Sequence, residues 1–455
     1  MKFDTLKDEL LEIALKGLKY AKSQGARETE IFVSSFSSSQ ATIQQGMVDA
    51  SDGISEGIGV RIADSKKLGF ASATGLSEDS LKFAVREALS VTRTVDEKNV
   101  KFEGFAVPRK GGREGILDES LLEMGGEDIV SNVEEIFSEA NQYDKRVVSV
   151  TGQVSLSHGG FAVSNTEGVE RATRITSAVY IIYITALENS KRKTALDFIV
   201  SRKKPEFQGL GENGARKAIA MLESKSLKTS EKLTTLWDPL TASQFLSTAL
   251  ASSINGRSVV EGRSAFADKI GDRVGVRELN VRDDGQILES VSTSSVDFEG
   301  TPRQNTSIIR KGVLKSFIFD DYYAKVFGTQ STGNANRSSQ APYESSPRIG
   351  TTTLVLEPGS KKREEMISEI DKGVLLTDIL MGMGHANQIS GDFSIVCTNP
   401  YLVDKGELKG ALEPVTIAGN MYKSFEQLRE IGSDALLTPF AFTPSLCFED
   451  FTVSG

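Results

Sequence analysis

Apolar residues recur along the N-terminal part of the chain with two different periods. Between residues 3 and 22 they are spaced three and four apart, and Gly25 follows the last of them. This spacing predicts an amphipathic helix with the glycine at its C-terminal cap. From about 28 to 64, the stretches ETEIFVSSF, SQATIQQG and GIGVRIAD alternate apolar and polar side chains. We expect each of these stretches to form a strand.

Glycines and a serine divide these elements. Gly53, Gly57 and Gly59 are predicted to lie at turns or where another part of the chain approaches closely, because glycine adds no side chain there. Ser77, followed by two acidic residues, predicts the N-terminal cap of a second helix with apolar residues on one face. The first part of the chain is therefore predicted as helix, strands and helix.

The next part of the chain continues to alternate between helix and strand. A helix is predicted near 126–142, strands between 147 and 203, and a further helix near 210–224. His158 precedes two glycines and is predicted at a solvent-facing hairpin turn. The polar segment ESKSLKTSEK (223–232) is a candidate domain boundary.

Strand-forming stretches punctuated by glycine dominate the second half. They follow a predicted helix near 240–253, and the stretch 331–350 is so rich in Ser, Asn, Gly and Pro that we expect a long irregular loop. The predicted fold class is α/β of the α+β type, with two domains at 1–225 and 226–455. Each domain should contain mostly antiparallel or mixed sheets flanked by helices.

Composition and charge narrow the classes of function. The 455 residues carry a formal net charge of −9, with an isoelectric point near 5.2. This balance argues against nucleic-acid binding, because phosphates select a basic surface. The N-terminus lacks the apolar core of a signal peptide, and no run reaches about 18 apolar residues, so we expect a cytoplasmic protein that does not enter a membrane.

The rare residues His385 and Cys397 lie close together in GHANQISGDFSIVC, with Asp392 between them. A catalytic zinc needs three protein ligands, and a spacing of five puts Asp392 and Cys397 on opposite faces of a regular strand. We therefore expect His385 in a loop and Cys397 in a buried strand, with a metal site or a Cys-His nucleophile as the less favoured alternatives. Cys397 and Cys447 should be reduced, buried thiols.

Two pairs of neighbouring carboxylates are candidate acids or bases. They are Asp283–Asp284 and Asp320–Asp321. Such pairs are common at turns and solvated helix ends, so we expect both to be structural, and the tyrosines after the second pair to pack. The glycines near His385 form no phosphate-binding motif, so nucleotide binding is unsupported.

Several ordered stretches of the second half form one series. They are DFEGTPRQNTSIIRKGVLKSFIFDDYYAKVFGTQSTGNANRSS (297–339), TTTLVLEPG (351–359), GVLLTDILMGMGHANQISGDFS (373–394), PVTIAGN (414–420) and FTVSG (451–455). This series closely resembles the TldD/PmbA family. In the first half, GIGVRIADSKKLGFASATGLSEDSLKFAVREA (57–88) is similar to the first domain of the same family. The resemblance thus spans nearly the whole chain.

The resemblance implies a two-domain α/β protein of a peptidase family found as a heterodimer. One type of subunit, TldD, carries zinc on a His-Glu-x-x-x-His helix, with a cysteine near the C-terminus as a further ligand. The other type, called PmbA or TldE, lacks the metal motif and completes the substrate chamber. Roles in the family include peptide cleavage, maturation of a microcin and turnover of an antitoxin.

This chain departs from the TldD type at the metal helix. By the resemblance, that helix lies in FLSTALASSINGRSVV, where Ser247, Thr248 and Ser252 take the places of His, Glu and His. Cys447 lies in the closing strand motif, and the segment that should hold the ligand cysteine, REIGSDALLTPF (429–440), has no thiol. The resemblance therefore implies the PmbA/TldE-like type, with no cofactor in this chain and zinc in a TldD-like partner.

On this interpretation the chain is a noncatalytic subunit that shapes a chamber and holds extended peptide by strand addition at a sheet edge. The candidates for lining the chamber are Thr332, Gly333, Asn334, Arg337 and Asp392. Loop stabilisation is the alternative role, with Asn334 in a left-handed turn and Arg337 paired with a carboxylate.

Two other functions stay open at this point. A hydrolase active alone would need a serine nucleophile or a metal held by carboxylates, and neither arrangement is recognisable. A homodimeric peptide-binding protein without catalysis would pair with itself, because similar folds offer similar surfaces.

Overall fold

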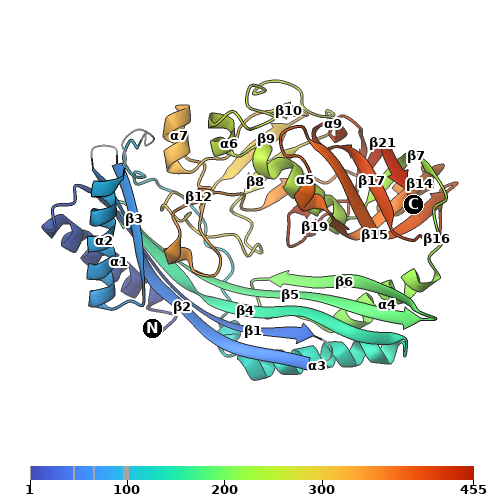
Figure 1. Ribbon diagram of the computed structural model, residues 1–455, viewed down its shortest axis with the longest axis horizontal. Helices are drawn as coiled ribbons and strands as arrows, with labels where there is room; N and C mark the ends of the chain where they lie inside the picture. The colour runs from blue at the N-terminus through green and yellow to red at the C-terminus, as the bar shows by residue number, and fades with distance from the viewer. Residues whose placement is uncertain (1, 45–46, 65–66, 96–101) are drawn as a thin grey trace.

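The first half of the chain builds one long antiparallel sheet with strand order β3-β2-β1-β4-β5-β6. The computed structural model describes residues 2–44, 47–64, 67–95 and 102–455. The long strands curve across the lower part of Figure 1. They are β1 (Glu28–Gln44), β2 (Met47–Asp64), β3 (Lys67–Thr74), β4 (Val147–Asn165), β5 (Glu170–Glu188) and β6 (Lys191–Ser201).

Helices cover one face of this sheet. Ile31 and Val33 of β1 pack under the first two helices, and Ala41 and Ile43, further along the same strand, pack under the third. All four positions are odd-numbered, so the even-numbered side chains of β1 point the other way, toward the second half of the chain. The helices are α1 (Leu6–Ser23), α2 (Glu78–Thr94), α3 (Gly126–Tyr143) and α4 (Leu210–Ala220).

In the second half, the strands β14-β7-β21-β17-β15 form a ring, because β15 also pairs with β14. β16 and β18 extend this ring by pairing with β15 and β21. The strands are β7 (Ser230–Trp237), β14 (Lys372–Met381), β15 (Asp392–Asp404), β16 (Glu407–Ala411), β17 (Val415–Asn420), β18 (Leu428–Ile431) and β21 (Leu446–Ser454).

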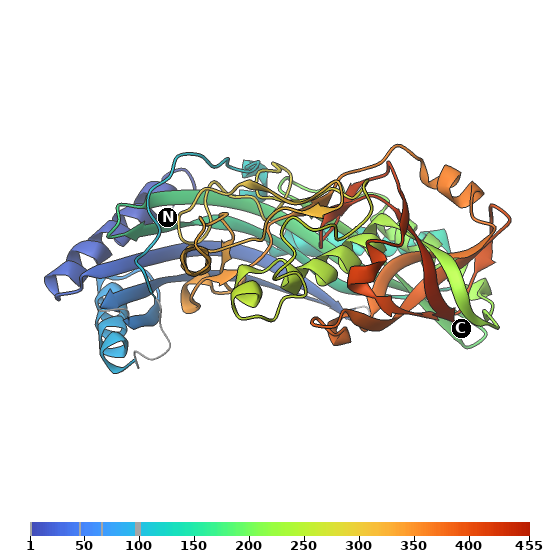
Figure 2. The same ribbon diagram turned by 90° about the horizontal axis from the view of Figure 1, so that it is seen from above.

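A second sheet of the same half has the order β10-β9-β8-β13-β20-β19. Its strands are short, and long irregular segments connect them (Figure 1). They are β8 (Val281–Asp284), β9 (Asn305–Arg310), β10 (Val313–Leu314), β13 (Leu354–Leu356), β19 (Leu436–Leu437) and β20 (Phe442–Thr443). Seen from above, the second half lies over the long sheet (Figure 2).

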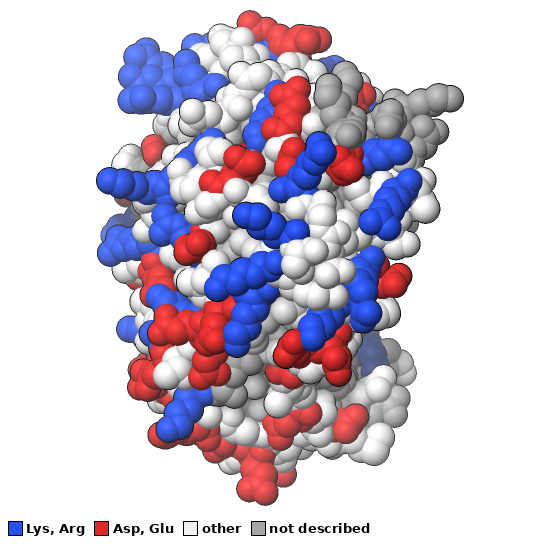
Figure 3. Space-filling view, turned by 90° about the vertical axis from the view of Figure 1, so that its left-hand side faces the viewer, with Lys and Arg blue, Asp and Glu red and all other residues white. Residues whose placement is uncertain are grey.

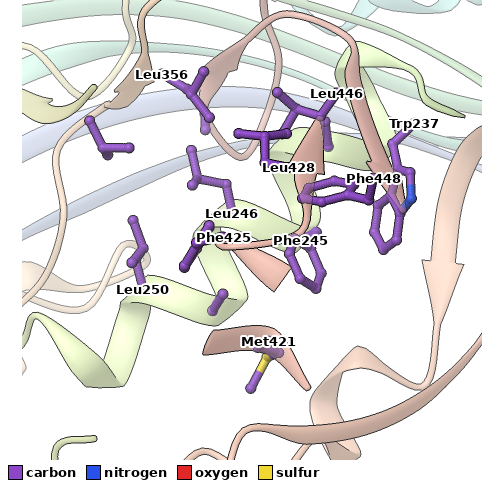
Figure 4. Packing of buried hydrophobic residues seen from close by; sticks show 14 of the residues in the cluster. Trp237, Phe245, Leu246, Leu250, Leu356, Met421, Phe425, Leu428, Leu446 and Phe448 are labelled. Carbon is purple, nitrogen blue, oxygen red and sulfur yellow. The ribbon is translucent and has the colours of Figure 1, made fainter. Parts of the chain in front are cut away.

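The largest hydrophobic core surrounds α5 (Pro239–Ser253). Phe245 of this helix meets Trp237 of β7 at a ring-centroid distance of 4.8 Å, and Trp237 meets Phe448 of β21 at 5.4 Å (Figure 4). Leu246 and Leu250 pack in the same core. α5 is therefore held by one face, and its other face carries polar, half-buried side chains.

Much of the sequence-based fold is confirmed. The protein is a mixed α+β structure with antiparallel and mixed sheets. Ser77 caps α2, accepting the backbone N–H of Ser80 at 3.1 Å, and α5 occupies nearly the range expected. Each sheet draws its strands from one side of residue 225, and the domain boundary there stays a prediction. Among the described residues, no helix is long and apolar enough to span a membrane.

Two expectations about the long sheet were wrong. The three stretches between 28 and 64 form two strands, because the first stretch and the described part of the second, up to Gln44, both lie within β1. Residues 45–46 of the second stretch lie outside the described residues. His158 is not in a turn: it lies inside β4, opposite Ser37 of β1 and Thr176 of β5. The adjacent glycines misled the prediction, since they sit in a strand where neighbouring backbones approach closely.

Candidate functional site

Four of the five predicted site residues lie together in the loop that follows α7 (Asp321–Phe327). The Thr332 hydroxyl donates to Asn334 Oδ1 at 2.7 Å and accepts the backbone N–H of Phe319, also at 2.7 Å. Gly333, rather than Asn334, adopts the left-handed conformation, with φ +75°. This backbone geometry lets the loop pass close to Pro302, where a side chain at Gly333 would collide with the carbonyl.

Asn334 connects this loop to β8. Its Nδ2 donates to Asp283 Oδ2 at 2.6 Å, and the Thr352 hydroxyl donates to the same oxygen at 2.9 Å. Asp283 is only 1% exposed, and burial raises its pKa. The expectation that Asp283 lies at a solvated turn was therefore wrong, although its role is structural.

Arg337 reaches the long sheet of the first half. Its guanidinium carbon lies 4.3 Å from the ring centroid of Phe32, and Nη2 lies 3.2 Å from Glu30 Oε1. Nη1 donates to the backbone carbonyl of Ser345. Burial lowers the pKa of Arg337 to about 9. Arg337 thus has the carboxylate partner that the loop-stabilising alternative predicts.

A second arginine joins the two halves at the same place. Arg61 of β2 donates twice to Glu30, at 2.8 and 2.7 Å, and once to Glu299 of the second half, at 2.8 Å. All three side chains are buried, and the two carboxylates raise the pKa of Arg61 against the effect of its burial. A fork of this kind fixes both carboxylates in position.

Further buried carboxylates surround this pair of arginines. Asp297 accepts the backbone N–H groups of Glu299, Thr301 and Ala335 at 2.9, 2.9 and 3.0 Å, and burial, followed by the charge of Glu299, raises its pKa to about 7. We call the whole set the buried junction: Glu30, Arg61, Asp283, Asp297, Glu299, Arg303, Asp320, Asp321 and Arg337.

The pair Asp320–Asp321 also belongs to this junction. Asp320 accepts the backbone N–H of Tyr323 and caps α7, and Asp321 pairs with Lys325 at 2.7 Å. Their exposed fractions are 4% and 5%, so this helix end is buried rather than solvated as expected. The tyrosines after the pair meet edge to face, at a centroid distance of 4.9 Å.

Asp392 lies apart from the other predicted site residues. It is exposed at the start of β15, where Asn420 Nδ2 and the Ser390 hydroxyl donate to its carboxylate at 2.9 and 2.8 Å and lower its pKa. Cys397, on the opposite face of the strand, is buried, and burial raises its pKa to about 12. The predicted placement of Asp392 and Cys397 on opposite faces is confirmed, and a chamber-lining role for all five residues stays a prediction.

The face of α5 where the resemblance puts the metal ligands is uncharged. Ser247, Thr248 and Ser252 are half-buried on this face, and the Thr248 hydroxyl donates to the carbonyl of Gln244 at 2.9 Å. The segment 429–440 lies against the same helix, because the Thr438 hydroxyl donates to Ser243 Oγ at 2.7 Å. The structure therefore brings together the two segments in which the resemblance expects metal ligands.

These residues do not fit zinc. Structural and catalytic zinc sites use imidazole nitrogen, thiolate or carboxylate, whereas the α5 face offers hydroxyl and amide groups. In the part of the chain that the structure describes, no group of three or more His, Cys, Asp or Glu residues is placed to hold a metal ion. Cys447 is no substitute, because burial raises its pKa to about 12.

Comparison with known proteins decides the family. The descriptions PmbA/TldA metallopeptidase domain 1, central domain and C-terminal domain match residues 29–92, 119–222 and 230–455 in order. The chain belongs to the PmbA/TldA metallopeptidase family. The first two matches both fall on the long sheet, which they divide between β3-β2-β1 and β4-β5-β6.

Individual relatives carry the names of both subunit types. The metalloprotease PmbA of Escherichia coli O157:H7 is 24% identical over 94% of this chain and 91% of its own length. A metalloprotease TldD homolog of Buchnera aphidicola is also 24% identical, over 83% of this chain and 79% of its own length. The crystal structure of TldE from Thermococcus kodakarensis matches with a TM-score of 0.89 at 24% identity, covering 97% of this chain and 100% of that one. This last likeness shows the fold alone.

Glu30 and Arg61 were missed in the sequence. Arg61 is a single charged residue inside an otherwise apolar stretch, GVRIA, and Glu30 directly precedes the apolar run IFV. A lone charge in a strand that is buried on both faces needs an ionic partner, so this pattern is a usable signal. The partner itself, Glu299, lies 238 positions from Arg61 along the chain.

Proposed function

We propose that this chain is a noncatalytic, PmbA/TldE-like subunit of a metallopeptidase complex whose zinc belongs to a TldD-like partner. The observation that carries the proposal is the uncharged face of α5. By the family resemblance, Ser247, Thr248 and Ser252 occupy the ligand positions there, and hydroxyls do not hold zinc. Burial keeps both thiols protonated, so neither offers a nucleophile or a ligand.

In such a complex this chain contributes a peptide-binding surface rather than catalytic residues. It would shape the chamber and hold extended peptide, while zinc in the partner would polarise the carbonyl of the peptide bond to be cut. The expected partner is a TldD-like chain of the same fold, and self-pairing is the alternative. A cytoplasmic location is part of the proposal.

The first test is the zinc content of gel-filtration peaks, measured by elemental analysis. The purified chain should elute without stoichiometric zinc, and a mixture with a TldD-like subunit should give a shared peak that contains zinc and cleaves unstructured peptide. Stoichiometric zinc in the chain alone would overturn the proposal. So would peptide hydrolysis by the chain alone that a chelator does not inhibit.

A matched pair of variants sharpens this test. Ser247→Ala should leave the peptidase activity of the mixed complex within twofold, because the hydroxyl takes no part in bond cleavage. In the TldD-like partner, replacing the first histidine of the His-Glu-x-x-x-His motif by alanine should abolish activity. A complex inactivated by Ser247→Ala, with zinc and assembly intact, would show that this chain takes part in the chemistry.

A further inference from the structure

One face of the long sheet carries none of the helices α1–α4, and only part of it is covered. Ala41 and Ile43 of β1 pack under α3, so the even-numbered positions of β1 point to the free face. Toward one end of this face, Phe32 and Phe161 are covered by Phe298 of the second half, which stacks on Phe161 at 4.5 Å. Beyond them the face continues across β1, β4, β5 and β6, and we call this continuation the outer sheet face.

Strand register assigns the residues of the outer sheet face. Directly opposed residues of antiparallel strands point to the same side, so one line runs from Gln40 through Ser155 and Val179 to Val200. Alternation along each strand then gives the others. The face comprises Ser38, Gln40 and Thr42 of β1, Thr151, Gln153 and Ser155 of β4, Ser177, Val179, Ile181 and Tyr183 of β5, and Leu196, Phe198 and Val200 of β6.

On these four strands the face carries no charged side chain, although 25% of the whole chain is charged. Asp49 of the neighbouring strand β2, opposite Thr42, is an exposed charge at its border. By contrast, the end of the molecule where α1 and α2 lie shows basic and acidic groups close together (Figure 3). Solvent-facing sheet surfaces of soluble proteins usually carry charges. An uncharged face four strands wide therefore selects a neutral ligand.

The outer sheet face is divided into an apolar and a polar part. Val179, Ile181, Tyr183, Phe198 and Val200 are half-buried, and none of them packs into a hydrophobic core of the described residues. The neighbouring strands β1 and β4 present hydroxyl and amide groups instead. Apolar side chains of a ligand can therefore bind on β5 and β6, and its backbone amides can bind on β1 and β4.

The edge of β6 beside this face is already occupied. Asp378 of β14, held at φ +71°, accepts the backbone N–H of Leu196 at 2.7 Å and Nδ2 of Asn399 at 2.8 Å. Asn399 also donates to the carbonyl of Thr194, and Lys217 donates to the carbonyl of Leu196. These side chains use the hydrogen-bonding groups of Thr194 and Leu196 that an added strand would need there, so this part of the edge directs a ligand to the face.

At the end nearer to Phe298, a buried arginine bounds the face. Arg202, directly after β6, donates to the carbonyls of Ser290 and Thr293 at 3.1 and 2.7 Å and so holds a loop of the second half there. Between this loop and Asp378, the six residue steps from Ser177 to Tyr183 span about 20 Å of strand. That length suits about six residues of extended peptide.

We infer that the outer sheet face binds an extended, uncharged segment of unfolded polypeptide, with its apolar side chains on β5 and β6. Figure 1 shows α5 and β19 on the same side of the sheet, opposite to α3 and α4. The inference rests on the proposed function, because it identifies the surface with which a noncatalytic subunit would hold the peptide.

Fluorescence anisotropy with the full chain tests this inference. The probe is a labelled ten-residue peptide of Ser, Gln, Val, Ile and Phe, with matched peptides in which three residues are replaced by Lys or by Glu. The neutral peptide should bind at least tenfold more tightly than either charged one. Ile181→Lys should weaken its binding at least tenfold. The control Ile54→Lys changes a residue that is 72% exposed on the opposite face, and should have less than a twofold effect.

Each outcome decides for or against the inference. Gln153→Lys is a second variant, on an exposed position, for the case that Ile181→Lys fails to fold. Unchanged peptide binding by a folded variant, or no binding by the wild-type chain, would overturn the inference. The inference would also be overturned if either variant still binds the peptide but no longer co-elutes with a TldD-like subunit, because the face would then be a subunit interface. Binding by the chain alone needs no partner, so a failure of the proposed complex is seen separately, in the zinc measurement.

Discussion

The buried junction and the outer sheet face occupy the same side of the same sheet, yet they differ in almost every property. At the junction, Arg337 stacks on Phe32 of β1, and carboxylates from both halves meet. A few residues along β1, Ser38, Gln40 and Thr42 carry no charge and touch no core. Arg337, from a stretch that carries the family resemblance, lies in the first region, and Asn334 of the same stretch donates to its Asp283. No such stretch marks the second region. A residue of a family motif can therefore stabilise the fold, while a stretch outside any motif forms an exposed, uncharged sheet surface.

Arg61→Ala should have the largest effect on stability, and it tests whether the buried junction differs from the rest of the molecule. It leaves Glu30 and Glu299 buried without their shared cation, so we expect the free energy of unfolding to fall by about 3–5 kcal/mol. Urea unfolding, followed by the fluorescence of the single tryptophan, measures the loss. The control Arg257→Ala removes an exposed pair with Glu261 and should cost less than about 0.5 kcal/mol. Equal losses would show that the junction is no stronger than a surface ion pair.

Gly57→Ala should have the next largest effect. A Cβ there would lie 2.5 Å from the ring of Tyr343, which the second half inserts against β2, and 2.6 Å from the carbonyl oxygen of Ala73. We expect a loss of about 1–3 kcal/mol in the same unfolding experiment. Gly53→Ala is the matched control, because its nearest atom would be 3.9 Å away. A control that destabilises as much as Gly57→Ala would mean that the contact with Tyr343 does not decide the effect.

Carboxylates outnumber arginines in the buried junction, and the pH dependence of the free energy of unfolding tests the effect of this excess. The pKa of Asp297 is raised to about 7 from an ordinary 3.8, so the folded protein binds this proton more tightly than the unfolded chain. Its contribution to stability is therefore fully present below about pH 4 and is lost as the pH rises through 7. Between these limits the slope contributed by one group is at most about 1.4 kcal/mol per pH unit.

Asp297→Asn isolates that slope. The amide does not titrate, so the free energy of unfolding should fall less steeply between pH 5 and 7 than in the wild type, whatever constant loss of stability the substitution brings. Unfolding curves at several pH values give both slopes. Parallel slopes for the two proteins would show that Asp297 takes up no proton in this range.

The smallest expected effect is on the outer sheet face. Gln153→Ala changes an exposed residue with no hydrogen-bonded partner in the described part of the chain, so stability should change by no more than about 0.5 kcal/mol. The same urea experiment measures it. A loss of about 3 kcal/mol or more, of the size expected for Arg61→Ala at the junction, would mean that the two regions are not distinct in their packing.

Local signals along the chain predicted most of the helices and strands. Helical spacing and the cap at Ser77 placed α1 and α2, and alternation placed the long strands. The errors share one cause. His158 and Asp320 lie next to residues that favour turns, but contacts with distant parts of the chain put the first inside a strand and bury the second.

The sequence by itself determined the periodic elements, the family and the lack of zinc ligands at Ser247, Thr248 and Ser252, because each depends on residue types at short or ordered spacings. Only the tertiary structure decided that Arg61 meets Glu299 and that the apolar residues of β5 on the outer sheet face stay half-buried, outside the hydrophobic cores of the described residues. Both facts depend on which of two sheet faces the second half of the chain covers and how far that cover extends. Side-chain alternation along one strand distinguishes the faces, but it carries no information about what packs on each.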